Sequence, residues 1–341
     1  MEYLSKVHAR NLVAWAKNRP DAIVMSADLT SSVECDLFRA AYPDRFFSMG
    51  IAEQNMLSMA GGMAREGFVP LVHTFAVFIY RRAYDQIAIS AAYPNLPVKM
   101  FGFLPGVMTP GGATHQAIED IAVMRALPNM TILECGDATD VESVLDLAYA
   151  TAGPVYVRML RGDLPRLFPA NEPMRLGLPR VLSKGPNTTP DITVLSSGIC
   201  TEEAMRACAA LRKHGIAATH LHVSTLKPFD CPAIMDSISQ SKYGVVTMEN
   251  HTVIGGLGAI IAECMAEAGI SKKLVRTGLP DTFLHGASKS YLMNKYGINA
   301  RGLIRSVERL TGENIDISDY EYALPLPEPS TLDKSGKAED L

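Results

Sequence analysis

Short apolar runs alternate with amphipathic segments along the first half of the chain. The runs are five or six residues long and lie at 22–26, 69–74, 98–103, 130–134 and 155–159. The segments between them have helical spacing of apolar positions, and several open with Ser, Thr or Asp as a cap; they are 32–41, 52–65, 78–92, 114–126 and 139–151. This alternation predicts a parallel sheet covered by helices on both faces, in a domain that ends near residue 170.

A second series of the same kind follows a stretch rich in Pro, Gly and Asn. Its expected strands and helices include 192–197, 201–213, 218–223, 243–249, 256–268 and 273–277. The sequence therefore predicts an α/β protein of two open, mostly parallel α/β domains. We expect these at 1–170 and 191–315, joined by a linker at 171–190. The tail at 316–341 mixes proline, acidic and small residues without an apolar period, so we expect it to be extended or disordered.

Length, charge and cysteine spacing exclude several functional classes of protein for this chain. The length of 341 residues suits two domains. A net charge of −4 without a long Lys/Arg run excludes nucleic acid and acidic membrane surfaces as expected partners. The six cysteines lack the spacing of a metal site, so we expect reduced thiols and no zinc. The first residues lack a signal peptide's apolar core and no run is long enough to span a membrane, which predicts a cytoplasmic protein.

The candidate chemistry begins with residues 47–61, FSMGIAEQNMLSMAG, where a strand is expected to run into a helix with Glu53 in its first turn. A lone glutamate there would do no more than complement the helix dipole. Further segments follow the same order along the chain: SADLT at 26–30, HTF at 73–75, RAYDQ at 82–86, THQAIE at 114–119, RALPN at 125–129 and RGDLP at 161–165.

In order and spacing these segments resemble the pyrimidine-binding half of transketolases and of the related 1-deoxyxylulose-5-phosphate synthases. The resemblance continues through 244–258 and covers nearly the whole chain. It implies a thiamine-diphosphate-dependent transferase of carbohydrate metabolism. Glu53 would be the carboxylate that hydrogen-bonds the cofactor's pyrimidine ring and activates it. The resemblance also implies cofactor contacts from Asp28, Ile51, Phe75 and Phe78, although the two phenylalanines could equally be ordinary core residues.

The same resemblance suggests how substrate is held. His115 would contact or protonate the oxygen of the substrate carbonyl, unless it is only a helix-terminus residue. Arg161, Arg82 and Ser32 would bind an anionic sugar, because a guanidinium offers paired donors to a phosphate or sulfonate. Each arginine has an alternative as a surface ion pair with an acid such as Asp85 or Asp163; this alternative suits Arg82 better than Arg161. We also expect Ile51, Met56 and Met59 to supply apolar surroundings for Glu53. His251 would be structural.

The chain lacks the G-D-G motif with which full-length transketolases hold the cofactor's diphosphate and metal. The resemblance therefore implies a split transketolase, in which an N-terminal-half partner subunit holds diphosphate and Mg²⁺ or Ca²⁺ and the two subunits form a heterotetramer.

The run before THQ departs from the usual pattern: Gly111 stands where an aspartate is expected and Phe103 about where a histidine is. The ketose donor, the aldose acceptor and the choice between phosphate and sulfonate stay open. So do three alternatives: acyloin synthesis like that of 1-deoxyxylulose-5-phosphate synthase, the β subunit of an oxoacid dehydrogenase, and a non-catalytic scaffold.

Overall fold

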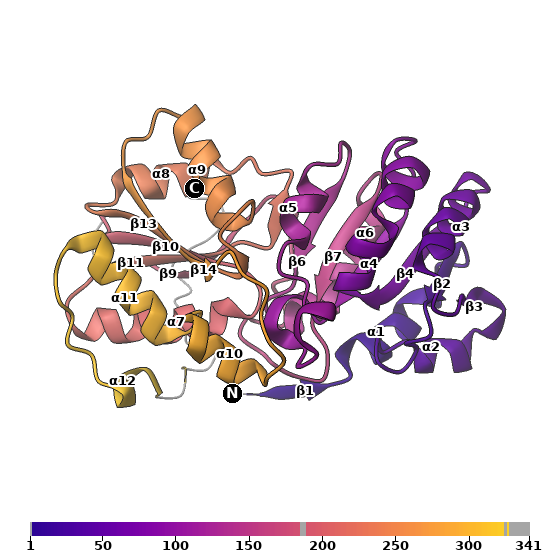
Figure 1. Ribbon diagram of the computed structural model, residues 1–341, viewed down its shortest axis with the longest axis horizontal. Coiled ribbons are helices and arrows are strands. Elements are labelled where there is room, and N and C mark those ends of the chain that lie inside the picture. The colour runs from indigo at the N-terminus through magenta and orange to yellow at the C-terminus, as the bar shows by residue number, and fades with distance from the viewer. Residues whose placement is uncertain (1, 185–188, 324–325, 327–341) are drawn as a thin grey trace.

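The computed structural model describes residues 2–184, 189–323 and 326, which form two α/β halves lying side by side (Figure 1). The sheet of the first half has the strand order β12-β6-β7-β5-β4-β2-β3. Its strands are β2 (Ala22–Ser26), β3 (Phe46–Ser48), β4 (Val69–Phe75), β5 (Lys99–Phe103), β6 (Thr131–Glu134), β7 (Val155–Met159) and β12 (Thr225–Lys227). Neighbouring strands are parallel except β12, which pairs antiparallel with β6.

Both faces of this sheet are buried because successive residues of each strand point to opposite sides. In β4, Val72 packs on one side with α3 (Glu53–Arg65), α4 (Ala76–Gln86) and α5 (Asp120–Arg125). Leu71 packs on the other side with α1 (Val7–Ala16), α2 (Asp36–Ala41) and α6 (Ala138–Ala150). The predicted parallel sheet with helices on both faces is thus confirmed.

The second half repeats the plan with the strand order β14-β13-β10-β11-β9. Its strands are β9 (Arg180–Ser183), β10 (Ile192–Ser196), β11 (Ala218–His222), β13 (Gly244–Thr252) and β14 (Lys273–Leu279). Its helices are α7 (Cys200–Lys213), α8 (Pro232–Gln240), α9 (Leu257–Glu267), α10 (Lys289–Tyr296), α11 (Ala300–Thr311) and α12 (Asp319–Ala323). A small ribbon of β1 (Tyr3–Ser5) and β8 (Asp163–Pro165) ties the N-terminus to the end of the first half.

Three segments differ from expectation. The stretch interpreted as a linker contains β9, which pairs antiparallel with β11. The segment at 114–126 is helical only from Asp120, because residue 117 instead bridges to Pro105 and its carbonyl accepts from Gly106 N at 2.7 Å. The tail prediction is wrong at α12, and most of the remaining tail lies outside the described residues. Among the described residues, no helix is long and apolar enough to cross a bilayer.

The two halves are joined around a buried charge, Arg158 of β7. Its guanidinium pairs with Asp120 at 2.9 Å and with Glu134, and all three side chains are buried. It also donates to the carbonyl oxygen of Asn250 in β13, at 2.9 Å. Arg158 therefore contacts the second half directly while it neutralises two buried carboxylates of the first.

We predict that Arg158→Leu strongly destabilises the protein, because it leaves two carboxylates unpaired in the core. Removal of one partner from a buried pair typically costs about 3–5 kcal/mol. Urea unfolding can be followed by the fluorescence of Trp15, the chain's one tryptophan. The matched control is Lys6→Leu, which breaks an exposed pair with Asp36 and should cost about 0–1 kcal/mol. Equal losses in the two variants would contradict the central role of Arg158.

Candidate functional site

Phe78, in the first turn of α4, is the centre of a group of side chains at the end of β4. Its ring stacks on that of Phe75, the last residue of β4, with centroids 5.9 Å apart. It meets the ring of His115 edge-on at 5.4 Å, and the guanidinium carbon of Arg82 lies 4.1 Å from its centroid. Arg82 reaches the ring because it lies four residues further along the same helix face. The structure thus brings together three predicted functional residues around Phe78.

Glu53 joins this group from α3. It is the first residue of the helix, where the positive end of the helix dipole favours a carboxylate. Its side chain is only 3% exposed, and its Oε1 accepts from Arg82 Nη1 at 2.9 Å. Arg82 is 46% exposed. The site therefore holds a buried carboxylate whose single cationic partner has access to solvent.

The apolar surroundings of Glu53 differ from the expected set. Met56 is buried, as expected, but Ile51 is 74% exposed and Met59 is exposed. The reason is helical geometry: the buried face of α3 carries Glu53, Met56 and Leu57, whereas Ile51 precedes the helix and Met59 lies off that face. The expectation that Ile51 and Met59 shield this carboxylate within the chain is wrong.

His115 lies on a short loop after the 3₁₀ turn η4 (Gly112–Thr114), and its Nδ1 hydrogen-bonds Thr114 Oγ1 at 2.9 Å. Gly111 allows this position, since a Cβ there would lie 2.8 Å from the Cβ of His115. An aspartate in place of Gly111 would push the imidazole away. Phe103, the other departure, is fully buried against His8 and does not line the site.

Arg81 holds the loop of His115 in place, a function that the sequence reasoning missed. Its Nε donates to Glu119 Oε1 at 2.8 Å and its Nη1 to the carbonyl oxygen of Ala113 at 2.7 Å, so it grips the chain on both sides of His115. Arg81 and Arg82 are neighbours on α4 and point in different directions.

A separate group forms around Arg161, which follows β7. Its Nη1 donates to the carbonyl oxygen of Ser32 at 2.8 Å, and Gly162 N donates to Glu34 Oε1 at 3.0 Å. Asp28, which shortly precedes Ser32 in the sequence, is exposed, and its φ of 57° lies in the left-handed region. Neither arginine forms the anticipated surface pair: Arg82 pairs with Glu53, and Arg161 binds a backbone carbonyl. Within the described residues, no hydrogen bond joins this second group to Glu53 or His115.

The contacts of the second half with the site include two that hold the segment leading to His115. Asn250 donates to the carbonyl oxygen of Pro105 and accepts from Val107 N, both at 3.0 Å, which fixes the start of the segment leading to His115. A Cβ on Gly112 would lie 3.0 Å from Gly286 N, so two glycines allow the backbones to approach. His251 is fully buried and away from solvent. Burial lowers its pKa to about 4, so its side chain is neutral.

This arrangement suits a planar nitrogen heterocycle, because one arginine contacts both an aromatic ring and a buried carboxylate that can bind a ring nitrogen. It does not suit Mg²⁺ or Ca²⁺, which prefer several oxygen ligands. In the described part of the chain, the one close group of possible metal ligands is His8, Cys35 and His73, which offer nitrogen and sulfur.

Comparisons with known proteins show which family and which fold the chain resembles. Residues 4–166 match the family "Transketolase, pyrimidine binding domain" and residues 184–303 match "Transketolase, C-terminal domain". The 6-deoxy-6-sulfo-D-fructose transketolase subunit SqwH of Clostridium sp. is 36% identical, over 91% of this chain and 94% of its own. One of the subunits of an apulose-4-phosphate transketolase from Actinobacillus succinogenes is 32% identical, over 89% and 96%. A solved structure described as "Split gene transketolase, inactive beta4 tetramer" superposes with a TM-score of 0.82 at 36% identity, covering 90% of this chain and 97% of that one.

We predict that Arg81→Ala loosens the loop of His115. Loss of hydrogen bonds to a charged group, about 1.5–3 kcal/mol, should raise amide hydrogen exchange in residues 112–119 roughly 10- to 100-fold. Arg39→Ala is the control, since Arg39 is exposed on α2 away from this loop. Unchanged exchange in the Arg81 variant would show that the loop is held by other contacts.

Proposed function

The chain belongs to the transketolase family, and from this we propose that it is the pyrimidine-binding subunit of a split transketolase. It would transfer a two-carbon ketol unit from a ketose to an aldose, using thiamine diphosphate. The observation that carries the proposal is the buried carboxylate of Glu53, joined through Arg82 to the ring of Phe78, on which Phe75 stacks. Thiamine diphosphate, when bound, supplies a carbon nucleophile once its C2 proton is lost.

In this proposal Glu53 hydrogen-bonds the pyrimidine nitrogen and shares a proton with it. The low exposure of Glu53 excludes competing water, and the aromatic face of Phe75 or Phe78 orients the ring. Asp28 and Ile51 remain proposed cofactor contacts. Because Ile51 is exposed, its contact would have to form across a subunit interface.

His115 is proposed to donate a hydrogen bond to the substrate's carbonyl oxygen. Its contact with Phe78 places it beside the proposed cofactor position, and the grip of Arg81 limits its movement. Arg161 and the neighbouring Ser32 would bind the anionic head of the sugar, with Arg82 as a second candidate. The names of the two relatives each specify an anionic sugar, one sulfonated and one phosphorylated, which supports an anionic ketose here.

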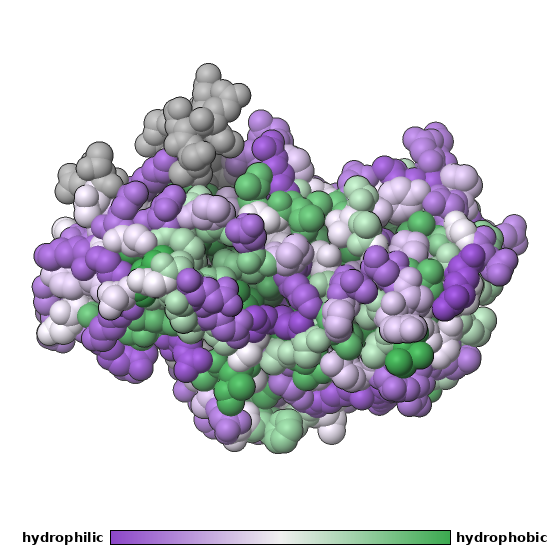
Figure 2. Space-filling model, turned by 90° about the horizontal axis from the view of Figure 1, so that it is seen from above, coloured by the Kyte–Doolittle hydropathy of each residue, from purple (hydrophilic) through white to green (hydrophobic). Residues whose placement is uncertain are grey.

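The diphosphate and its metal, Mg²⁺ or Ca²⁺, would be held by an N-terminal-half partner subunit. The sequence has no G-D-G, and the described residues offer no close group of oxygen ligands. Exposed apolar side chains along α3 and the π-helical turn η2 (Ile87–Ala92), including Met59 and Ile89, support burial by another subunit and hence a heterotetramer. Figure 2 shows further hydrophobic residues near the middle of one face. We propose a cytoplasmic location.

We predict that Glu53→Gln, assembled with its partner subunit, loses about 10²- to 10⁴-fold in kcat, since an amide cannot share a proton with the pyrimidine nitrogen as a carboxylate does. Ketol transfer is measured with ketose donors and aldehyde acceptors. The control is Glu66→Gln, an exposed residue just after the same helix. Near wild-type turnover by the Glu53 variant would remove its assigned role. Carbon dioxide release from pyruvate by the wild-type pair would instead favour the two alternatives that decarboxylate an oxoacid, acyloin synthesis and an oxoacid dehydrogenase.

Arg161→Ala should raise KM for an anionic ketose roughly 10- to 100-fold, because a charge-assisted contact of about 1.5–3 kcal/mol is lost. Hydroxypyruvate and glycolaldehyde are too short to reach Arg161, so their rates should hardly change. Equal losses with long and short substrates would mark Arg161 as a structural residue that holds the backbone at Ser32.

A further inference from the structure

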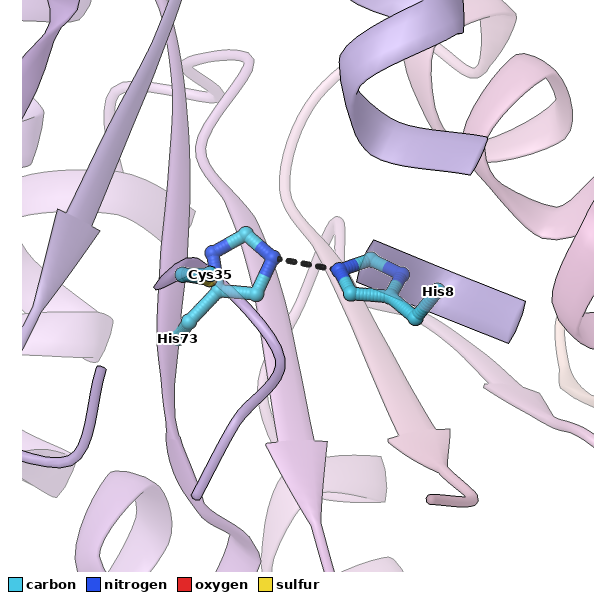
Figure 3. Close-up of side chains that lie close together, drawn as sticks. All are labelled: His8, Cys35 and His73. Atoms are coloured by element: carbon cyan, nitrogen blue, oxygen red, sulfur yellow. Dashed lines mark hydrogen bonds between the residues drawn. The ribbon is translucent and has the colours of Figure 1, made fainter. Parts of the chain in front are cut away.

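Three side chains that the proposed function does not use meet inside the first half of the molecule. They are His8 of α1, Cys35 just before α2, and His73 of β4, and all are fully buried (Figure 3). One nitrogen or sulfur atom from each lies within 4.8 Å of the other two. Because they come from distant parts of the sequence, their convergence leaves no recognisable motif spacing.

Hydrogen bonding fixes the lone pair of His73. Its Nδ1 lies 3.0 Å from the carbonyl oxygen of Leu71, which only accepts, so Nδ1 carries the proton. Its Nε2 therefore has a free lone pair and accepts from Nε2 of His8 at 3.0 Å. A ring nitrogen held by a backbone carbonyl in this way is the usual arrangement behind a metal-binding histidine.

The surroundings keep both imidazoles neutral. The ring of His73 stacks on Phe101 with centroids 4.9 Å apart, and that of His8 meets Phe103 at 5.4 Å. The hydrogen bond between the two rings and that from His73 to the carbonyl oxygen of Leu71 place one proton on each imidazole, so both are neutral. Neutral imidazoles are the form that binds a metal ion.

We propose that His8, Cys35 and His73 form a binding site for one Zn²⁺ ion. Zinc binds imidazole nitrogen at about 2.0–2.1 Å and thiolate sulfur at about 2.3 Å, which places two nitrogen ligands roughly 3.3 Å apart around a tetrahedral ion. His8 would move its Nε2 proton to Nδ1, which is buried without a hydrogen-bond partner among the described residues, and the present separation of 3.0 Å between the histidines needs to grow by only a few tenths of an ångström. The fourth position of the ion would be left to water.

Charge also favours a cation at this place. Cys35 is flanked in the chain by two carboxylates, Glu34, which is buried, and Asp36. Loss of the thiol proton would leave a zinc ion with one net positive charge, which these carboxylates offset. The bound ion would join α1, β4 and the loop that carries Ser32 and Glu34, which contacts Arg161 and Gly162.

The test uses the full-length chain without a histidine tag, stripped with a chelator and then dialysed against Zn²⁺. We expect roughly one zinc per chain by elemental analysis. With Co²⁺ as a spectroscopic substitute, the wild-type protein should show a thiolate-to-cobalt charge-transfer band and the d–d bands of a tetrahedral ion. Cys35→Ser should lose the charge-transfer band and bind Zn²⁺ at least ~10-fold more weakly. Cys135→Ser, which removes another fully buried cysteine, should retain both properties.

The wild-type spectrum decides the proposal even where a variant fails to fold. Absence of the charge-transfer band in the wild type would overturn it, and so would a band that persists in Cys35→Ser or disappears in Cys135→Ser. The outcome is independent of ketol transfer, since it is read without substrate, cofactor or partner subunit.

Discussion

The pairing of Arg158 with Asp120 and Glu134 is the constraint on which the rest of the molecule depends. A guanidinium in the middle of a fully buried strand is tolerated only when its charge and its donors are satisfied. The two carboxylates come from the first half, but a remaining donor is satisfied by the carbonyl of Asn250 in the second. Docking of the two halves is thereby coupled to the electrostatics of the core. The side chain of Asn250 in turn fixes the backbone at Pro105, from which the chain runs to His115.

The pattern of apolar and polar residues was sufficient to predict those helices and strands that are buried by their own apolar side chains. The parallel strands are apolar on both faces, so the runs at 22–26 and 155–159 were identified with the bounds that β2 and β7 have. The pattern did not predict strands that form because they pair with a strand distant in the sequence. β9 lies in a stretch of turn-forming residues and becomes a strand because β11 offers it an edge. β12 lies within the sequence of the second half, between β11 and α8, but pairs with β6 of the first sheet.

The sequence predicted the residue types of the candidate site, but not the ion pairs and hydrogen bonds between them. Family resemblance pointed to Glu53, Phe75, Phe78 and His115. In the structure Phe75 and His115 contact the ring of Phe78, and Glu53 is joined to that ring through Arg82. The partner of Arg82 could not be predicted, because Glu53 lies 29 residues away on another helix. The grip of Arg81 on the loop of His115 was equally hidden, since it binds mainly backbone carbonyls, whose positions no residue type reveals.

Asp120 and Glu53 are both buried acids that pair with an arginine, but they differ in how exposed that arginine is. Asp120 is paired with an arginine that is itself fully buried, so neither group can exchange its partner without unfolding the core. Glu53 is as well buried, but its partner Arg82 is 46% exposed and can turn toward water at little cost. A carboxylate that is shielded from solvent and yet can be released from its cation is able to take a new hydrogen-bonding partner. That freedom is what a residue that binds a cofactor ring requires, and the fixed Arg158 cluster keeps the surrounding backbone in place while the exchange occurs.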